Sequence, residues 1–280
     1  MPSGDRPPDT PIAKSRHRIA LGVEYNGSDF HGWQVQSHGL ATVQGCLQRA
    51  LAKVANHPIT VICAGRTDAG VHASAQVVHF DTYAEREDKA WVFGANAHLP
   101  RKISVRWAKE VDSRFHARFA ALSRRYLYLI FNSRVRSALF ADELTLEFRD
   151  LDATRMNRGA SYLLGENDFT SFRAANCQSK TAMRNVTALS VHRRGDLILI
   201  DITANAFLHH MVRIIAGVLI DVGAGVKEPE WVAELMEAKD RNLASVTAPP
   251  NGLYLVKVAY PEAFGLVNEP IGPHFLGLLE

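Results

Sequence analysis

The expected secondary structure of this chain repeats once in the order strand-helix-strand-strand-helix-strand. This repeat constrains the fold more than any other feature of the sequence. The first copy begins with alternating apolar residues and contains a helix that Thr42 is suited to cap. Its expected elements are a strand at 19–23, a helix after Thr42, strands at 59–63 and 76–80, a helix at 88–98 and a strand at 103–107.

The second copy follows the same order with one additional acidic helix. Its expected elements are a strand at 124–131, a helix at 152–164, strands at 186–192 and 197–204, helices at 210–222 and 229–238, and a closing strand at 253–258. Two split β-α-β units predict an α+β protein of two ferredoxin-like domains with antiparallel sheets. We place these domains at residues 18–112 and 113–260, between a disordered tail at 1–17 and a C-terminal tail at 261–280.

Composition indicates a globular protein, because 47% of the 280 residues are hydrophobic and the charges are mixed. Cys46, Cys63 and Cys177 lack the spacing of a thiolate zinc site and are odd in number, which argues against a disulfide framework. We therefore expect a cytoplasmic protein. The sequence has neither a signal peptide nor an apolar run long enough to cross a bilayer, so we expect no membrane association.

Positive charge is concentrated in the middle of the chain. The basic residues between 101 and 136 are Arg101, Lys102, Arg106, Lys109, Arg114, Arg118, Arg124, Arg125, Arg134 and Arg136. Only Glu110 and Asp112 oppose these ten, which leaves a local charge of +8 (10 − 2). Such a segment suits a polyanion such as RNA, although a solvated basic surface has the same composition.

The nonapeptide Gly65–Ala73, which reads G-R-T-D-A-G-V-H-A, falls between two expected strands. Gly65 and Gly70 permit a tight loop that holds Arg66 and Asp68 in fixed directions. A simple polar turn is the alternative interpretation. An ionised aspartate suits a nucleophile, a base or a stabiliser of a cationic sugar.

A basic partner for Asp68 is offered by Arg66 or by Arg213. Arg213 interrupts the apolar run Met211–Ile215, and a half-buried arginine needs an anion. Gly217, one turn later, allows another segment to approach closely. A water-facing helix arginine is the alternative.

Other site types are absent or weak. The chain contains no G-x-S-x-G, G-K-[ST] or H-E-x-x-H motif. His209 and His210 are adjacent on an expected helix, where neighbours point in different directions, so we interpret them as core or helix-start residues rather than metal ligands. Tyr126 lies beside arginines on an expected strand. Its ring could stack on a base of a nucleic acid, or it could simply belong to the hydrophobic core.

Taken together, these motifs resemble the tRNA pseudouridine synthase A family over about residues 18 to 260. The matching segments are the nonapeptide, Phe30–Gln34, Phe115–Phe119, Arg125-Tyr126, Asp168–Arg173 and Asn205–Arg213. Asn26, Asn167 and Ile214 depart from the family's usual residues.

The resemblance implies a pseudouridine synthase fold and an isomerase that acts on uridines at about positions 38 to 40 of the tRNA anticodon stem-loop. It also implies a homodimer that needs neither metal nor small-molecule cofactor. Asp68 matches the catalytic aspartate, Tyr126 the tyrosine that packs on the target base, and Arg213 the basic partner of the aspartate. Arg66 matches the arginine that helps displace the flipped base, and Leu253 an apolar wall of the pocket. We also expect Arg118, in the basic segment, to bind substrate.

Two rival functions remain. A structured-RNA-binding protein without chemistry needs only the basic segment and the ferredoxin-like halves. Phosphoester hydrolysis would use Asp68 and His72 as an acid-base pair.

Overall fold

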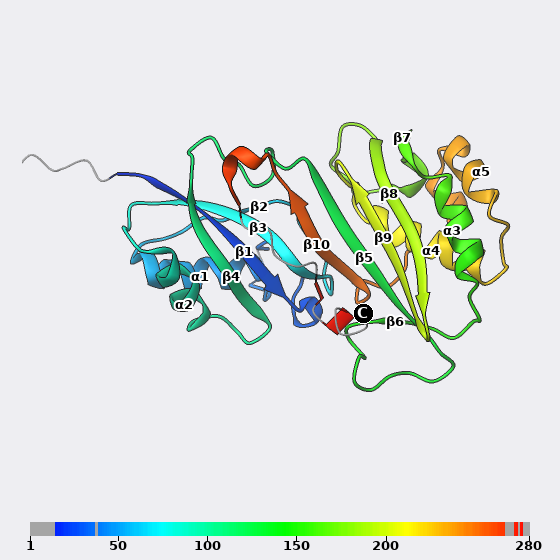
Figure 1. Cartoon of the computed structure of the whole chain (residues 1–280), viewed down its shortest axis with the longest axis horizontal. Coiled ribbons are helices and arrows are strands. Elements are labelled where there is room, and N and C mark those ends of the chain that lie inside the picture. Colours follow the sequence, from blue (N-terminus) through cyan, green and yellow to red (C-terminus); the bar gives the residue numbers. More distant parts are fainter. Residues whose placement is uncertain (1–14, 37–38, 267–271, 274, 277–280) are drawn as a thin grey trace, which may run out of the picture.

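The computed structural model describes residues 15–36, 39–266, 272–273 and 275–276. Its centre is a ten-stranded sheet with the order β4-β1-β3-β10-β5-β9-β8-β7, in which β2 pairs with β3 and β6 with β5. Helices α1 and α2 lie beside the first-half strands, and α3, α4 and α5 lie beside the second-half strands (Figure 1). The mixed α+β class predicted from sequence is confirmed.

In the first half the elements are β1 (His17–Tyr25), α1 (Val43–Ala55), β2 (Ile62–Cys63), β3 (His72–Thr82), α2 (Asp88–Asn96) and β4 (Ile103–Val111). In the second half they are β5 (Ser123–Asn132), β6 (Thr145–Glu147), α3 (Ala153–Ser161), β7 (Gly165–Asp168), β8 (Met183–Arg194), β9 (Leu197–Ala204), α4 (Met211–Gly223), α5 (Trp231–Ala238) and β10 (Leu253–Ala259). Four short 3-10 turns (Gly27–Asp29, Thr170–Phe172, Arg241–Leu243 and Glu262–Phe264) complete the described part of the chain.

Helix α1 forms where its pattern predicts. The Thr42 hydroxyl accepts the Gly45 N–H at 3.3 Å, which satisfies one of the free donors of the first turn. Leu47 and Leu51, one turn apart, are fully buried. The apolar face therefore fixes α1 against the sheet.

Strand β10 joins the two halves of the sheet. It pairs antiparallel with β5 and parallel with β3, where Tyr254 is opposite His72 and Leu255 opposite Ala73. The closing strand of the second half is thus also a neighbour of the first half, and the sheet is continuous. Because of this pairing and that of β5 with β6, the sheet is mostly, not wholly, antiparallel.

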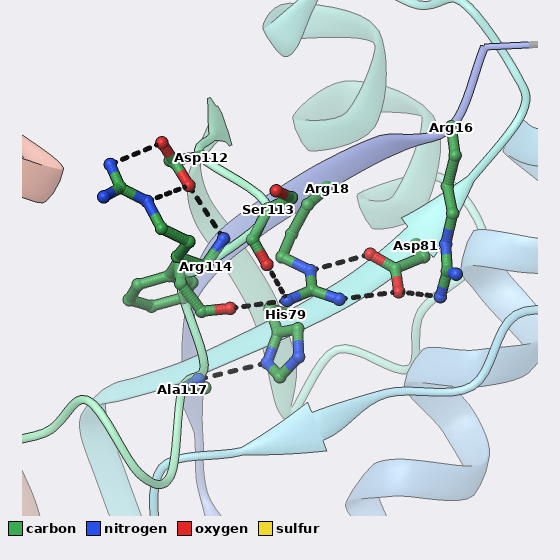
Figure 2. A network of polar contacts seen from close by, with 9 residues as sticks. Arg16, Arg18, His79, Asp81, Asp112, Ser113, Arg114 and Ala117 are labelled. Atoms are coloured by element: carbon green, nitrogen blue, oxygen red, sulfur yellow. Dashed lines mark hydrogen bonds and ion pairs between the residues drawn. The ribbon is translucent and has the colours of Figure 1, made fainter.

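A polar network ties β1 and β3 to residues 113–117, which lie within the basic stretch (Figure 2). Arg18 donates to both carboxylate oxygens of Asp81, at 2.7 and 2.9 Å, and to the carbonyl of Phe115 at 2.8 Å. His79 Nδ1 accepts the Ala117 N–H at 3.1 Å. The backbone just before Arg118 is therefore held by side chains of two strands.

The segments assigned to tails, 1–17 and 261–280, are each described in part. Residues 1–14 lie outside the described residues, and β1 begins at His17. In the C-terminal segment, Phe264 packs edge-on against Phe115 with ring centroids 5.2 Å apart. Phe275 packs against Phe140 at 5.5 Å. Within the described residues, no helix is long and apolar enough to cross a bilayer.

Candidate active site

The Asp68 loop is held by the core beneath it. The backbone N–H of Trp33 donates to the Thr67 carbonyl at 3.0 Å. The Thr67 hydroxyl lies 2.8 Å from the hydroxyl of the buried Tyr25. Gly70 has φ of 78°, a backbone conformation that favours glycine and reverses the chain. The Asp68 carbonyl accepts the Val71 N–H at 3.2 Å. The loop therefore presents the Asp68 carboxylate in one direction, as predicted, although β3 already begins at His72.

Arg213 of α4 reaches Asp68 from the other half of the chain. Its Nη1 donates to Asp68 Oδ2 at 3.3 Å, and its Nε donates to the Ala248 carbonyl at 2.8 Å. The Arg213 side chain is 14% exposed. The prediction that this arginine needs an anion is confirmed, and the alternative of a water-facing arginine is wrong.

Gly217 allows the strap of residues 246–248 to lie on α4. A Cβ atom at this position would be 2.1 Å from the Val246 carbonyl oxygen. The strap in turn supplies the Ala248 carbonyl that orients Arg213. The predicted close approach at Gly217 is thus confirmed, and it positions the arginine.

His209 and His210 also converge on Asp68, which corrects the sequence interpretation that they point in different directions. His209 Nε2 lies 3.4 Å from Oδ1, and His210 Nε2 lies 3.3 Å from Oδ2. The two residues precede α4 rather than lying within it, and His210 has φ of 61° in the left-handed region. This turn brings the ring centroids within 3.9 Å. The helical pattern of the sequence carries no signal for this turn, because periodicity treats His210 as a regular helical position.

Burial lowers the pKa of His210, and the nearby charges of His209 and Arg213 act in the same direction. The charge of Asp68 opposes this shift. The net effect favours the neutral imidazole of His210.

Tyr126 on β5 lies under the nonapeptide. Its hydroxyl would be 3.8 Å from a Cβ atom at Gly65, and its ring packs edge-on against Phe207 with centroids 5.0 Å apart. Burial raises the pKa of Tyr126, so the phenol is neutral. Leu253, buried at the start of β10, pairs with Tyr128 on the same strand β5.

Arg66 and Arg118 have exposed side chains. Burial raises the pKa of the Cys63 thiol to about 12, against the charges of Arg66 and Arg118, which favour the thiolate. Both guanidinium groups therefore lie in the neighbourhood of Cys63, at the end of β2. Arg118 also stacks on Phe119 at 5.6 Å. In the described part of the chain Arg213, not Arg66, forms the ion pair with Asp68.

His72 does not pair with Asp68, which contradicts the acid-base hypothesis for hydrolysis. Its Nδ1 accepts the Gly27 N–H at 3.0 Å, and its Nε2 lies 3.0 Å from the carbonyls of Asp142 and Asn251. The side chain is 1% exposed, and burial lowers its pKa. His72 is a structural residue beneath the loop.

Comparison with known proteins identifies the family. The model of the family described as tRNA pseudouridine synthase matches residues 22–120 and 160–261. The tRNA pseudouridine synthase A of Yersinia pseudotuberculosis is 58% identical over 259 residues, which cover 92% of this chain and 98% of that protein. That of Coxiella burnetii is 55% identical over 259 residues, covering 92% and 99%. The match includes both halves of the site, Asp68 from the first and Arg213 from the second, and the chain belongs to the tRNA pseudouridine synthase family.

Proposed function

We propose that this protein converts uridine to pseudouridine in tRNA, with Asp68 as its catalytic carboxylate. One observation carries the proposal: Asp68 on a braced loop of the first half meets Arg213 of the second half at 3.3 Å. Family membership supplies the reaction class, that of an isomerase. The site supplies a fixed, charge-balanced and partly exposed carboxylate to perform it.

The reaction breaks the N1–C1′ bond, turns the uracil and forms a C5–C1′ bond; the C5 proton is released and N1 takes up a proton. An ionised carboxylate can attack C1′, attack the base or take the C2′ proton, and each route gives the same product. Arg213 balances the charge of Asp68 and holds it in place. The target base must leave its stack before C1′ can be reached.

We assign the other predicted residues to substrate binding. Tyr126 packs on the flipped base, and its neutral phenol and edge-on contact with Phe207 support this role. Leu253 forms an apolar wall beside it. Arg66 helps displace the base, and Arg118 binds phosphate; both have exposed side chains that can reach a polyanion.

We further infer positions 38, 39 and 40 of the anticodon stem-loop as the target uridines, a homodimer, and a cytoplasmic location. The motif set supports the first two inferences, and three free cysteines support the third. Two ferredoxin-like domains at 18–112 and 113–260 are supported by the strand orders β4-β1-β3-β2 and β10-β5-β9-β8.

Tritium release from tRNA that carries C5-tritiated uridine tests the proposal. We expect Asp68→Asn to lower the rate by at least about 10³-fold, because the amide has neither the charge nor the basicity of the carboxylate. Asp150→Asn is the control, since this exposed aspartate forms, among the described residues, an ion pair with the surface residue Arg134. Unchanged release by Asp68→Asn would refute Asp68 as the catalytic carboxylate. No release by the unaltered protein while it still binds tRNA would favour the non-catalytic RNA-binding protein.

A further inference from the structure

We propose that Asp68, His209 and His210 form a binding site for one transition-metal cation of the Zn²⁺ class, and that the bound cation inhibits the enzyme. One ligand atom of each residue lies within 4.8 Å of the others. The inhibition, though not the binding, rests on the proposed role of Asp68.

The spacing of the three groups is close to that of ligands around a shared ion. Zn–N and Zn–O bonds are about 2.0–2.1 Å long, so two ligands of a tetrahedral site lie about 3.3–3.4 Å apart. His209 Nε2 and His210 Nε2 lie 3.4 and 3.3 Å from the Asp68 oxygens. An N–H···O hydrogen bond has its most frequent length near 2.9–3.0 Å. Each imidazole thus lies at about this ligand–ligand distance from one oxygen of the Asp68 carboxylate, His209 from Oδ1 and His210 from Oδ2.

Hydrogen bonds hold the backbone of both histidines in place. His209 donates its N–H to the Cys177 sulfur at 3.4 Å, and its carbonyl accepts the Ala174 N–H at 3.2 Å. The His210 carbonyl accepts the Ile214 N–H at 2.9 Å in the first turn of α4. A site of this kind loses little entropy on binding an ion.

The site is open to solvent and selective in its chemistry. The side chains of His209 and Asp68 are 40% and 27% exposed, so an ion can enter and keep a water as its fourth ligand. Two imidazoles and one carboxylate favour Zn²⁺, Ni²⁺ or Cu²⁺ over Mg²⁺, which prefers oxygen ligands. Arg213, 3.3 Å from Asp68, repels a cation. We therefore expect micromolar rather than nanomolar affinity.

The test uses the full chain without a histidine tag and titrates it with ZnCl₂ in a calorimeter and with CoCl₂ by visible absorption. We expect one ion per chain and the intense d–d bands of four-coordinate Co²⁺. His209→Ala, His210→Ala and Asp68→Asn should each weaken Zn²⁺ binding by at least about tenfold, because each removes a ligand. His98→Ala, which removes an exposed histidine elsewhere, is the matched control.

Absence of binding by the unaltered protein overturns the inference, as does binding that the three variants leave unchanged. Asp68→Asn differs from the natural side chain by one group of the same size, so it tests the site even where a histidine variant does not fold. Zn²⁺ should also abolish tritium release, and EDTA should restore it. Binding at the three residues without inhibition refutes the role of Asp68 and the inhibition but leaves the metal site standing. If activity depends on Asp68 but the protein does not bind Zn²⁺, the metal site is refuted and the proposed role of Asp68 stands.

Discussion

Replacing Gly217 by alanine tests whether a methyl group remote from Asp68 can lower activity by displacing the strap that orients Arg213. Gly217 has no contact with Asp68, but its Cβ would meet the Val246 carbonyl oxygen at 2.1 Å. Real Cβ atoms tolerate about 3.0–3.4 Å at the tightest, so the strap of residues 246–248 must retreat by about 1 Å. The Ala248 carbonyl moves with the strap, and Arg213 Nε loses its 2.8 Å hydrogen bond.

The magnitude follows from two opposing effects on stability and one on catalysis. Alanine in place of glycine inside a helix stabilises the folded state by about 0.5–1 kcal/mol, whereas forcing the strap outward costs about 1–3 kcal/mol. The net loss of unfolding free energy is therefore about 1 kcal/mol. A misplacement of about 1 Å at a catalytic group lowers the rate about 10²-fold. Activity should thus fall far more than stability.

Tritium release measures kcat/KM, and urea unfolding measures stability. Gly159→Ala is the matched control: it also lies in a helix, but its Cβ would meet only side chains, the nearest, Val232, at 3.3 Å. We expect that variant to retain full activity. A Gly217→Ala enzyme with kcat/KM within twofold of the unaltered protein would refute the role of the strap in orienting Arg213.

Two further predictions concern buried polar groups. Tyr128→Phe should lower the unfolding free energy in urea by about 1–2 kcal/mol, because the lost hydroxyl donates to the Pro249 carbonyl at 2.8 Å and lies 2.7 Å from the Thr145 hydroxyl; equal stability would show that water replaces it. The hydrogen bond from Arg18 holds the pKa of Asp81 below its ordinary 3.8. The stability from this pair is thus present at neutral pH and lost as the pH falls below about 3.8. Urea unfolding at several pH values should show Asp81→Asn converging on the unaltered protein in acid, and a constant difference would contradict this.

Local patterns predicted local structure well. Thr42 and the leucines that follow it specify α1, and Arg213 within an apolar run required an anion, which proved to be Asp68. Strands β6 and β7 were not predicted, because Thr145–Glu147 has three residues and Gly165–Asp168 is polar, so neither shows a clear apolar alternation. Both strands form only because they pair with a longer neighbour, β6 with β5 and β7 with β8.

The remaining errors arose where distant residues meet. Whether β10 lies beside β3 depends on a register between segments about 180 residues apart, which periodicity does not encode. The direction of the two histidine rings depends on one left-handed residue, His210, in a position that a helical pattern treats as regular. The partner of Asp68 was predicted, but the number of groups around it was not.

The position of β10 at the end of the chain also determines when the two halves of the sheet can join during synthesis. A ribosome delivers the Asp68 loop early and α4 much later, and the strand that joins their two halves emerges last among the described strands. Until residues 253–259 are available, the edges of β3 and β5 that they cover are open. A chain that stops before Leu253 therefore carries both Asp68 and Arg213 but lacks the strand that joins the two halves of the sheet.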